Sequence, residues 1–198
     1  MHRMSLRLFV WGVIAWLMVG CATPVSPSKE YLLTDEALST VRVQSTNPVF
    51  IQLMPVSMAN YLVGNEMVLV TRQGQVHRSK NNLWAEPLSS QLGRLIQQRL
   101  ESALPDITWV NTQAFFPQDA YELHVEIDTF FADLEGVTMI SGRWYMATKT
   151  GELLLADTFN ATNNMQSDGY QSMVKALSQS WSEQVITNLT QEIARYFQ

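Results

Sequence analysis

Four side chains that can bind metals or exchange protons alternate along one short stretch, "YELHVEIDTF" (121–130). They are Glu122, His124, Glu126 and Asp128. In an extended strand, residues two apart lie about 6.6–6.8 Å apart on the same face, so neighbouring carboxylates could share a cation. The positions between them are apolar, which is also typical of an antiparallel strand with one face on the core and the other in water. The row is therefore either a candidate site or a solvated strand face, and the pattern favours the second.

The rest of the chain offers little that could do catalysis. It contains no HExxH motif, no GxSxG elbow, no phosphate-binding loop and no GxGxxG after a strand, and His77 is isolated. A single cysteine can form neither an internal disulfide nor a zinc site by itself. We therefore predict no catalytic residue, no metal and no cofactor. A hydrolase that uses the Glu122–Asp128 face is the alternative.

The single cysteine, Cys21, follows a short positive segment and an uncharged apolar run at 8–19. About 20 apolar residues are needed to span a membrane, so this run favours a secretory signal peptide. With Gly20 before the cysteine, the stretch resembles the bacterial lipobox, although Met18 stands where that pattern usually has leucine. The resemblance implies that Cys21 is lipidated and becomes the new N-terminus. An ordinary signal peptide or an uncleaved anchor helix are the alternatives.

A lipidated Cys21 would attach the chain to a membrane through three acyl chains, and two or more chains anchor a protein stably. The next residue is Ala22 rather than aspartate. By resemblance to the sorting rule of enteric-type bacteria, this favours the periplasmic face of the outer membrane. We predict a cleaved signal peptide at 1–20, the lipidated cysteine with a tether at 21–29, and one domain at 30–198.

The predicted tether is short and rich in proline and serine. Eight or nine residues reach no further than roughly 30 Å, so the domain must lie close to its membrane. Two of the 13 basic residues and none of the 18 acidic residues lie at 1–20, so the mature chain has a net charge of −7. This charge argues against nucleic acid and against electrostatic attachment to anionic lipid.

Alternating apolar residues and turn signals predict a series of strands in the mature chain. The strand at 48–58 should end or bulge at Pro55, and the strands flanking Gly74 should form a hairpin. The predicted strands are 30–33, 48–58, 66–72, 75–79, 107–110, 120–131, 137–147 and 152–161.

Apolar residues at helical spacing predict two amphipathic helices, at 88–104 and at about 169–197. Asp168 is the expected N-cap of the second helix. The order of elements is strands, helix, strands, helix. It predicts an α/β (α+β) fold, in which a mixed β-sheet packs against two main amphipathic helices.

A set of motifs in fixed order lies between Phe50 and Leu100. Pro55 and Tyr61 occur in "LMPVSMANYL", a strand "MVLVTR" follows, and "WAEPL" opens the first helix. Together with the lipobox, they resemble the PqiC (YmbA)-type family of auxiliary lipoproteins of ABC-type, MCE-associated lipid transport systems. The motif residues are expected to be structural, and Pro87 and Glu86 suit the first turn of a helix. These residues are Pro55, Tyr61, Trp84, Glu86, Pro87 and Leu88.

The resemblance implies a lipoprotein without enzymatic activity on the inner leaflet of the outer membrane. Its expected partners are an MCE-domain membrane protein that forms a hydrophobic tunnel across the periplasm, and the inner-membrane partner of that protein. Copies of the chain are expected to assemble as a homo-oligomeric ring that docks on the tunnel. The alternative is a lipoprotein that activates a cell-wall synthase or builds a secretion pore. An activator would need a tether longer than roughly 30 Å to reach through the cell wall.

Overall fold

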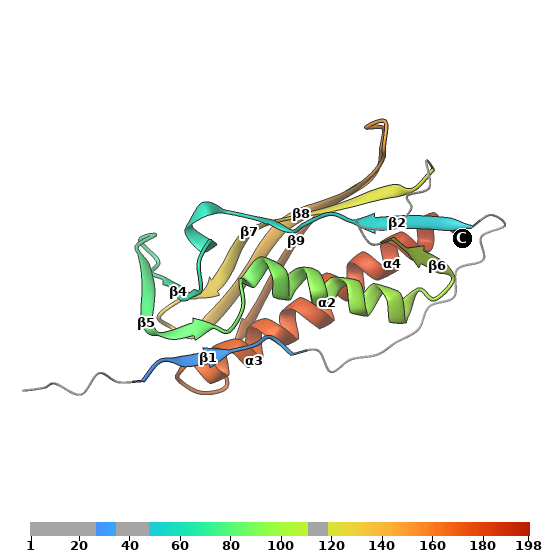
Figure 1. The fold of residues 1–198 in the computed structure, drawn as a ribbon. Coiled ribbons are helices and arrows are strands. Elements are labelled where there is room, and N and C mark those ends of the chain that lie inside the picture. The colour runs from blue at the N-terminus through green and yellow to red at the C-terminus, as the bar shows by residue number, and fades with distance from the viewer. Residues whose placement is uncertain (1–26, 35–47, 111–118) are drawn as a thin grey trace, which may run out of the picture.

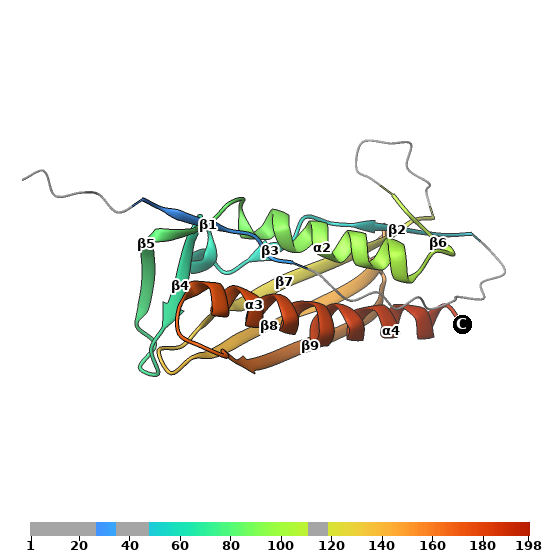
Figure 2. The same ribbon diagram turned by 90° about the horizontal axis from the view of Figure 1, so that it is seen from below.

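The computed structural model describes residues 27–34, 48–110 and 119–198. In this part of the chain, the strands form one nine-stranded mixed sheet. The helices lie on one side of the sheet (Figures 1 and 2). The predicted α/β fold with a mixed sheet and two main helical segments is confirmed. None of the described helices is long and apolar enough to cross a membrane.

Strand β7 (Tyr121–Ala132) organises the sheet because both of its edges are paired. Along one edge it pairs antiparallel with β8 (Val137–Thr148), which in turn pairs with β9 (Leu153–Asn164). This meander matches the predicted strands to within three residues. Along the other edge, three short N-terminal strands pair with β7 one after another, all in parallel. They are β2 (Val49–Leu53), β3 (Ser57–Met58) and β4 (Glu66–Val70).

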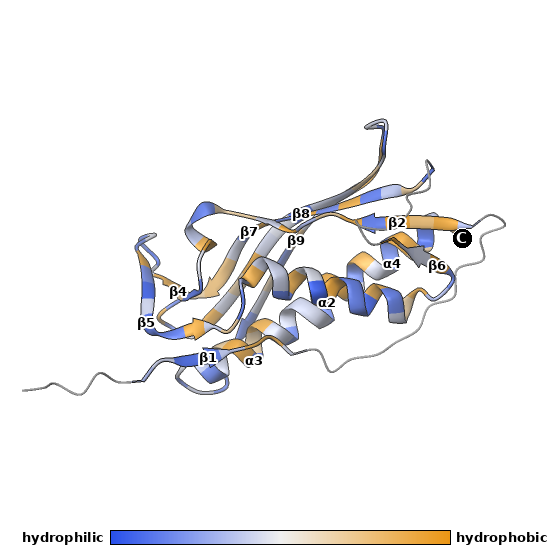
Figure 3. Cartoon of the chain, in the orientation of Figure 1, coloured by the Kyte–Doolittle hydropathy of each residue, from blue (hydrophilic) through white to orange (hydrophobic). Residues whose placement is uncertain are grey.

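The remaining strands extend the sheet beyond β2 and β4. Strand β6 (Ile107–Trp109) pairs in parallel with β2, and β5 (Val76–Trp84) forms the predicted hairpin with β4. Strand β5 ends five residues later than predicted, because β1 (Lys29–Tyr31) pairs with its last residues from a distant part of the chain. Figure 3 shows that β2 is coloured mainly hydrophobic and β5 mainly hydrophilic, in line with the exposure of β5.

Helix α2 (Leu88–Ala103) ends one residue earlier than predicted. The second predicted helix is present as α3 (Tyr170–Ser180), a π-helical turn η2 (Trp181–Ile186) and α4 (Thr187–Tyr196). The prediction that Asp168 is the N-cap of this helix is wrong. The chain enters α3 through Gly169, which takes a positive φ of 102° that favours glycine, and no side chain caps the helix.

The π-helical turn keeps the apolar stripe of the C-terminal helix on the sheet. Trp181, Val185, Leu189 and Ile193 follow one another at steps of four residues, and all are buried. In a regular α-helix, each such step advances the stripe about 40° past a full turn. The i→i+5 hydrogen bonds of a π-turn fit one more residue into the turn, which offsets this advance. The repeated spacing of four was the sequence signal for this turn.

A β-bulge interrupts the alternation of β7 at Asp128. Leu123, Val125 and Ile127 are buried as predicted, and Asp128 is exposed. After the bulge the phase changes, so that Phe130 also faces the core. A short 3₁₀ helix η1 (Asn60–Leu62) leads from β3 to β4 near this bulge.

Candidate binding groove

Two motif segments that are distant in the sequence pack against each other at the start of α2. Val56 and Leu62, from the segment that follows β2, are buried, and so is Leu88, the first residue of the helix. Gly93 of the helix lies beside Val56, and an added Cβ there would lie 3.5 Å from Val56 Cγ2, which is an ordinary contact distance. The motif residues therefore join the sheet to α2.

The "WAEPL" motif ends β5 and starts α2. Trp84 is buried, and its ring meets Phe130 edge-on with 6.2 Å between centroids. Pro87 lies at the N-cap, one position before the first turn where it was predicted, and its carbonyl accepts the amide of Ser90 at 3.0 Å. Glu86 forms an exposed ion pair with Arg94 of the helix.

Gln91 connects the N-terminal strand to the start of α2. Its side chain is fully buried, and its Oε1 accepts the backbone amide of Leu33 at 2.9 Å. Its Nε2 donates to the carbonyl of Glu86, also at 2.9 Å. One side-chain amide therefore holds the segment that follows β1 and the "WAEPL" motif together.

Replacing Gln91 with leucine is expected to destabilise the fold by about 1–3 kcal/mol, because the amide of Leu33 loses its partner in a buried position. Urea unfolding would measure the change. Gln97→Leu is the control, since the amide of Gln97 bonds to Glu101 at an exposed position. Equal losses in the two variants would contradict the role of Gln91.

Tyr61 stabilises the bulge of β7. Its hydroxyl donates to the backbone carbonyl of Asp128 at 2.8 Å, and its own carbonyl accepts from Arg78 Nη2 at 3.0 Å. Burial raises the pKa of Tyr61 above its ordinary value, and the negative charge of Asp128 raises the pKa further. The protonated hydroxyl is therefore favoured in the folded state.

Tyr61→Phe is expected to cost about 0.5–1.5 kcal/mol of unfolding free energy at neutral pH, because the hydrogen bond to Asp128 is lost. The pKa of Tyr61 is higher in the folded than in the unfolded state, so its contribution is complete below about pH 10 and falls as the pH rises through the folded pKa. Urea unfolding of both proteins from neutral to alkaline pH should show the difference shrinking. A difference that stays constant would contradict this assignment.

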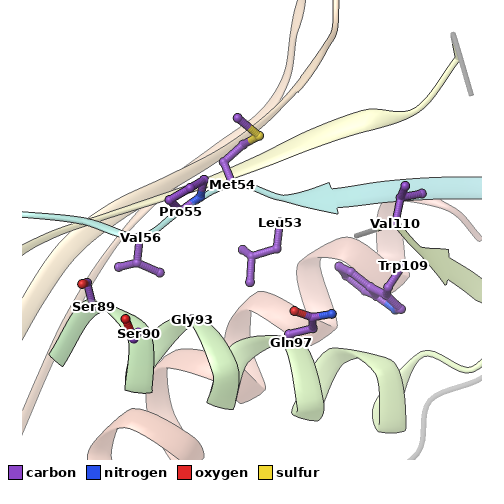
Figure 4. Close-up of a pocket in the computed structure, with 10 residues that line it drawn as sticks. All are labelled: Leu53, Met54, Pro55, Val56, Ser89, Ser90, Gly93, Gln97, Trp109 and Val110. Carbon is purple, nitrogen blue, oxygen red and sulfur yellow. The ribbon is translucent and has the colours of Figure 1, made fainter. Parts of the chain in front are cut away.

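A groove of about 240 Å³ lies between the end of β2 and helix α2. Figure 4 shows Leu53 and Val56 pointing toward the helix and Met54 pointing away from it. The helix contributes mainly small residues, and Trp109 of β6 lies at one end, with its Nε1 buried and without a hydrogen-bond partner in the described residues. The lining residues are Leu53, Met54, Pro55, Val56, Ser89, Ser90, Gly93, Gln97, Trp109 and Val110.

The groove suits binding rather than acid–base chemistry, since none of its lining residues is ionisable near neutral pH. Of the predicted motif residues, only Pro55 lines it. Sequence reasoning missed the helix side of the groove. The signal for it was the pair of small residues at helical spacing, Ser89 and Gly93, on a helix that otherwise carries long polar side chains on its outer face.

The row of polar residues on β7 lies on the outer face of the sheet, and Glu122, His124 and Glu126 contact neighbouring side chains. Glu122 Oε2 is 3.2 Å from His124 Nε2, and the His124 ring stacks on Tyr145 with 4.4 Å between centroids. Glu126 accepts from Arg143 Nε at 2.6 Å. Among the described residues, no three His, Cys, Asp or Glu side chains gather to hold a metal ion. The contacts are those of a solvated strand face.

Cys21 and the segment 1–26 lie outside the described residues, so the lipobox and most of the tether stay predictions. Comparisons with known proteins cover most of the chain. Residues 31–194 match the family model described as "ABC-type transport auxiliary lipoprotein component". The chain is also 28% identical, over 92% of its length and 95% of theirs, to the proteins named "Intermembrane transport lipoprotein PqiC" of Escherichia coli (strain K12) and Shigella flexneri.

Two crystal structures share this fold. An uncharacterized protein superposes with a TM-score of 0.65 at 32% identity, over 78% of this chain and 99% of that one. A Xanthomonas campestris protein of the DUF330 family superposes with a TM-score of 0.61, over 86% of this chain and 95% of that one. Its identity is 14%, so this likeness concerns the fold alone.

Proposed function

The chain belongs to the family of ABC-type transport auxiliary lipoprotein components, and we propose that it is the outer-membrane docking component of an MCE-type intermembrane lipid transport complex. The observation that carries the proposal is the family match over residues 31–194, together with similarity to PqiC along almost the whole chain. This is a family of transport auxiliary lipoproteins and not of enzymes.

The proposed location depends on Cys21. Acylation at this residue would place the chain in a membrane, and Ala22 at the next position favours the outer membrane. The tether at 21–29 reaches at most roughly 30 Å, which holds the folded domain at the membrane surface. A docking component has to work at this surface, so the short tether supports the proposal over an activator that must reach through the cell wall.

The proposed partners are an MCE-domain membrane protein and, through it, the inner-membrane component of the same system. Several copies of the chain would form a ring at the outer-membrane end of the partner's tunnel, so that lipids pass without entering water. The chain would contribute binding surfaces and no catalysis. The uncharged groove along α2 is consistent with this role, because it offers apolar and hydroxyl contacts and no acid or base.

Affinity purification of the full lipidated protein from gently solubilised membranes tests the proposal, with mass spectrometry of the proteins that are retained. Recovery of an MCE-domain protein in a complex larger than a monomer is the expected result. The control is Cys21→Ala behind an ordinary secretory signal, which should be released into the soluble periplasmic fraction. Recovery of a cell-wall synthase would favour the alternative function, and a lone monomer would contradict the docking role.

A further inference from the structure

The turn between β7 and β8 presents a leucine to solvent in a fixed position. Leu134 is 61% exposed. The side chain before it, Asp133, is buried, and its Oδ1 accepts the amides of Glu135 at 3.0 Å and Val137 at 2.8 Å. These bonds order the turn, so Leu134 is held outward. Turns usually carry polar residues at their tips, which makes a well-ordered, exposed leucine unusual here.

The apolar surface continues from Leu134 into a pocket of about 210 Å³. The pocket lies between the turn, strand β4 and the start of α3, and the amide of Met165 donates to the carbonyl of Gly136 at 2.8 Å to hold two of these parts together. Leu134 is therefore part of a continuous apolar surface and not an isolated side chain. We call this surface the Leu134 end; its residues are Leu69, Leu134, Met165 and Tyr170, and the buried Met173 also lines the pocket.

The Leu134 end lies at the end of the molecule from which the tether leaves. Glu30 and Glu66 are both in register with Leu83 of β5, and Leu69 of β4 is in register with Ala132 of β7. Three strand spacings and three residues along β4 therefore separate Glu30 from Ala132, which is no more than roughly 25 Å. Figures 1 and 2 both show β1 and the β7–β8 turn at the same end of the molecule.

The charges around the Leu134 end are partly neutralised. Arg72 Nε lies 3.5 Å from Glu135 Oε1, and both side chains are well exposed. Asp168, which is exposed, also lines the pocket and leaves its rim acidic. An acidic rim disfavours anionic headgroups, so attraction to them would not bring this surface to a membrane. Apolar contact beside zwitterionic headgroups fits the arrangement.

We propose that the Leu134 end lies against a phospholipid bilayer, with Leu134 inserted among the acyl chains. The inference rests on the proposed anchoring at Cys21, because a tether of at most roughly 30 Å that leaves from this end keeps the end beside the bilayer. This contact with the bilayer fixes the orientation of the domain relative to the membrane. The tip of the β8–β9 hairpin, where Leu153 is also 61% exposed, then faces away from the membrane and toward the periplasm.

Leu134 and Leu153 provide a matched pair for the test, because they are equally exposed leucines at opposite ends of the β7–β9 meander. The full lipidated chain is prepared as Leu134→Cys and as Leu153→Cys, labelled with an environment-sensitive thiol fluorophore, and placed in phosphatidylcholine vesicles that contain nitroxide lipid. The label at 134 should shift to the blue and lose fluorescence to the nitroxide, while the label at 153 should do neither. Equal behaviour of the two labels, or stronger quenching at 153, would overturn the proposed orientation.

The same preparation separates failure of the orientation from failure of the anchor. Cys21 is the only cysteine in the sequence, so the wild-type lipidated chain should take up no thiol label. Labelling of the wild-type chain, or its loss from the vesicles, would overturn the anchor and, with it, the orientation. If the wild-type chain takes up no label and stays on the vesicles, but the label at position 134 remains in water, the proposed orientation alone is overturned.

Discussion

Trp181→Ala is expected to destabilise the domain by about 3–5 kcal/mol, which is the usual loss when a large aromatic side chain is removed from a core. Trp181 is fully buried in the π-helical turn, and its ring meets Phe130 and Phe159 edge-on with centroids 6.2 and 6.0 Å apart. Domains are commonly stable by only about 5–15 kcal/mol, so the loss is a large share of the total. Urea unfolding followed by circular dichroism would measure it.

Trp181→Phe is the control for this prediction. It keeps an aromatic ring between Phe130 and Phe159, and it removes the indole Nε1, which is buried without a hydrogen-bond partner in the described residues. The phenylalanine variant should therefore lose clearly less unfolding free energy than the alanine variant. Equal losses would show that the ring contacts do not account for the effect, and an alanine variant as stable as the wild type would contradict the placement of Trp181.

Gly142→Ala is expected to cost about 3 kcal/mol, at the upper end of the usual range for overpacking. Gly142 of β8 lies opposite Ile127, next to the bulge of β7. A Cβ at this position would collide with the backbone carbonyl oxygen of Glu126 and lie 2.7 Å from Phe159 Cζ. The first of these atoms belongs to the neighbouring strand and cannot move away as a flexible side chain could. Thermal and urea unfolding would measure the loss.

Gly93→Ala offers the matched control, because the same change should have the opposite sign there. Gly93 lies inside α2, where alanine is favoured over glycine by up to about 1 kcal/mol. Its added Cβ would make an ordinary contact of 3.5 Å with Val56. A stabilised Gly93→Ala and a destabilised Gly142→Ala would support the packing at both places. A Gly142→Ala variant as stable as the wild type would contradict the close approach of β7 and β8.

The local pattern of the sequence predicted the main elements and a hairpin of neighbouring strands, but not the pairing of strands that lie far apart in the chain. Alternation from Tyr121 to Ile127 predicted β7, and the turn at Gly74 predicted the hairpin of β4 and β5. The parallel pairing of β2, β3 and β4 with β7 joins segments about 70 residues apart, and nothing in a local pattern records such a partner. For the same reason, Trp84 was predicted to follow the hairpin and not to belong to β5. Its strand partner, Tyr31, lies far away in the chain, and no local pattern indicates that pairing.

The candidate site was predicted in part. The motif residues Pro55 and Leu88 were singled out by resemblance, and the structure brings their segments together around Val56. The groove beside them needs Trp109 of β6, and its position depends on the pairing of β6 with β2. That pairing is a property of the folded sheet and not of the sequence around Trp109. Cys21 stays a prediction from its lipobox.

The use of a single strand as the partner for β2, β3 and β4 has a consequence for the order in which the domain folds. The N-terminal strands are synthesised some 70 residues before β7. Strand β4 can pair with β5, and β2 with β6, but only β7 joins β2, β3 and β4 into one sheet. The meander of β7, β8 and β9, by contrast, pairs neighbouring segments, and such local contacts form fastest. The C-terminal half therefore serves as the template for the N-terminal half. The N-terminal strands therefore cannot join into one sheet until β7, which ends at Ala132, has been synthesised.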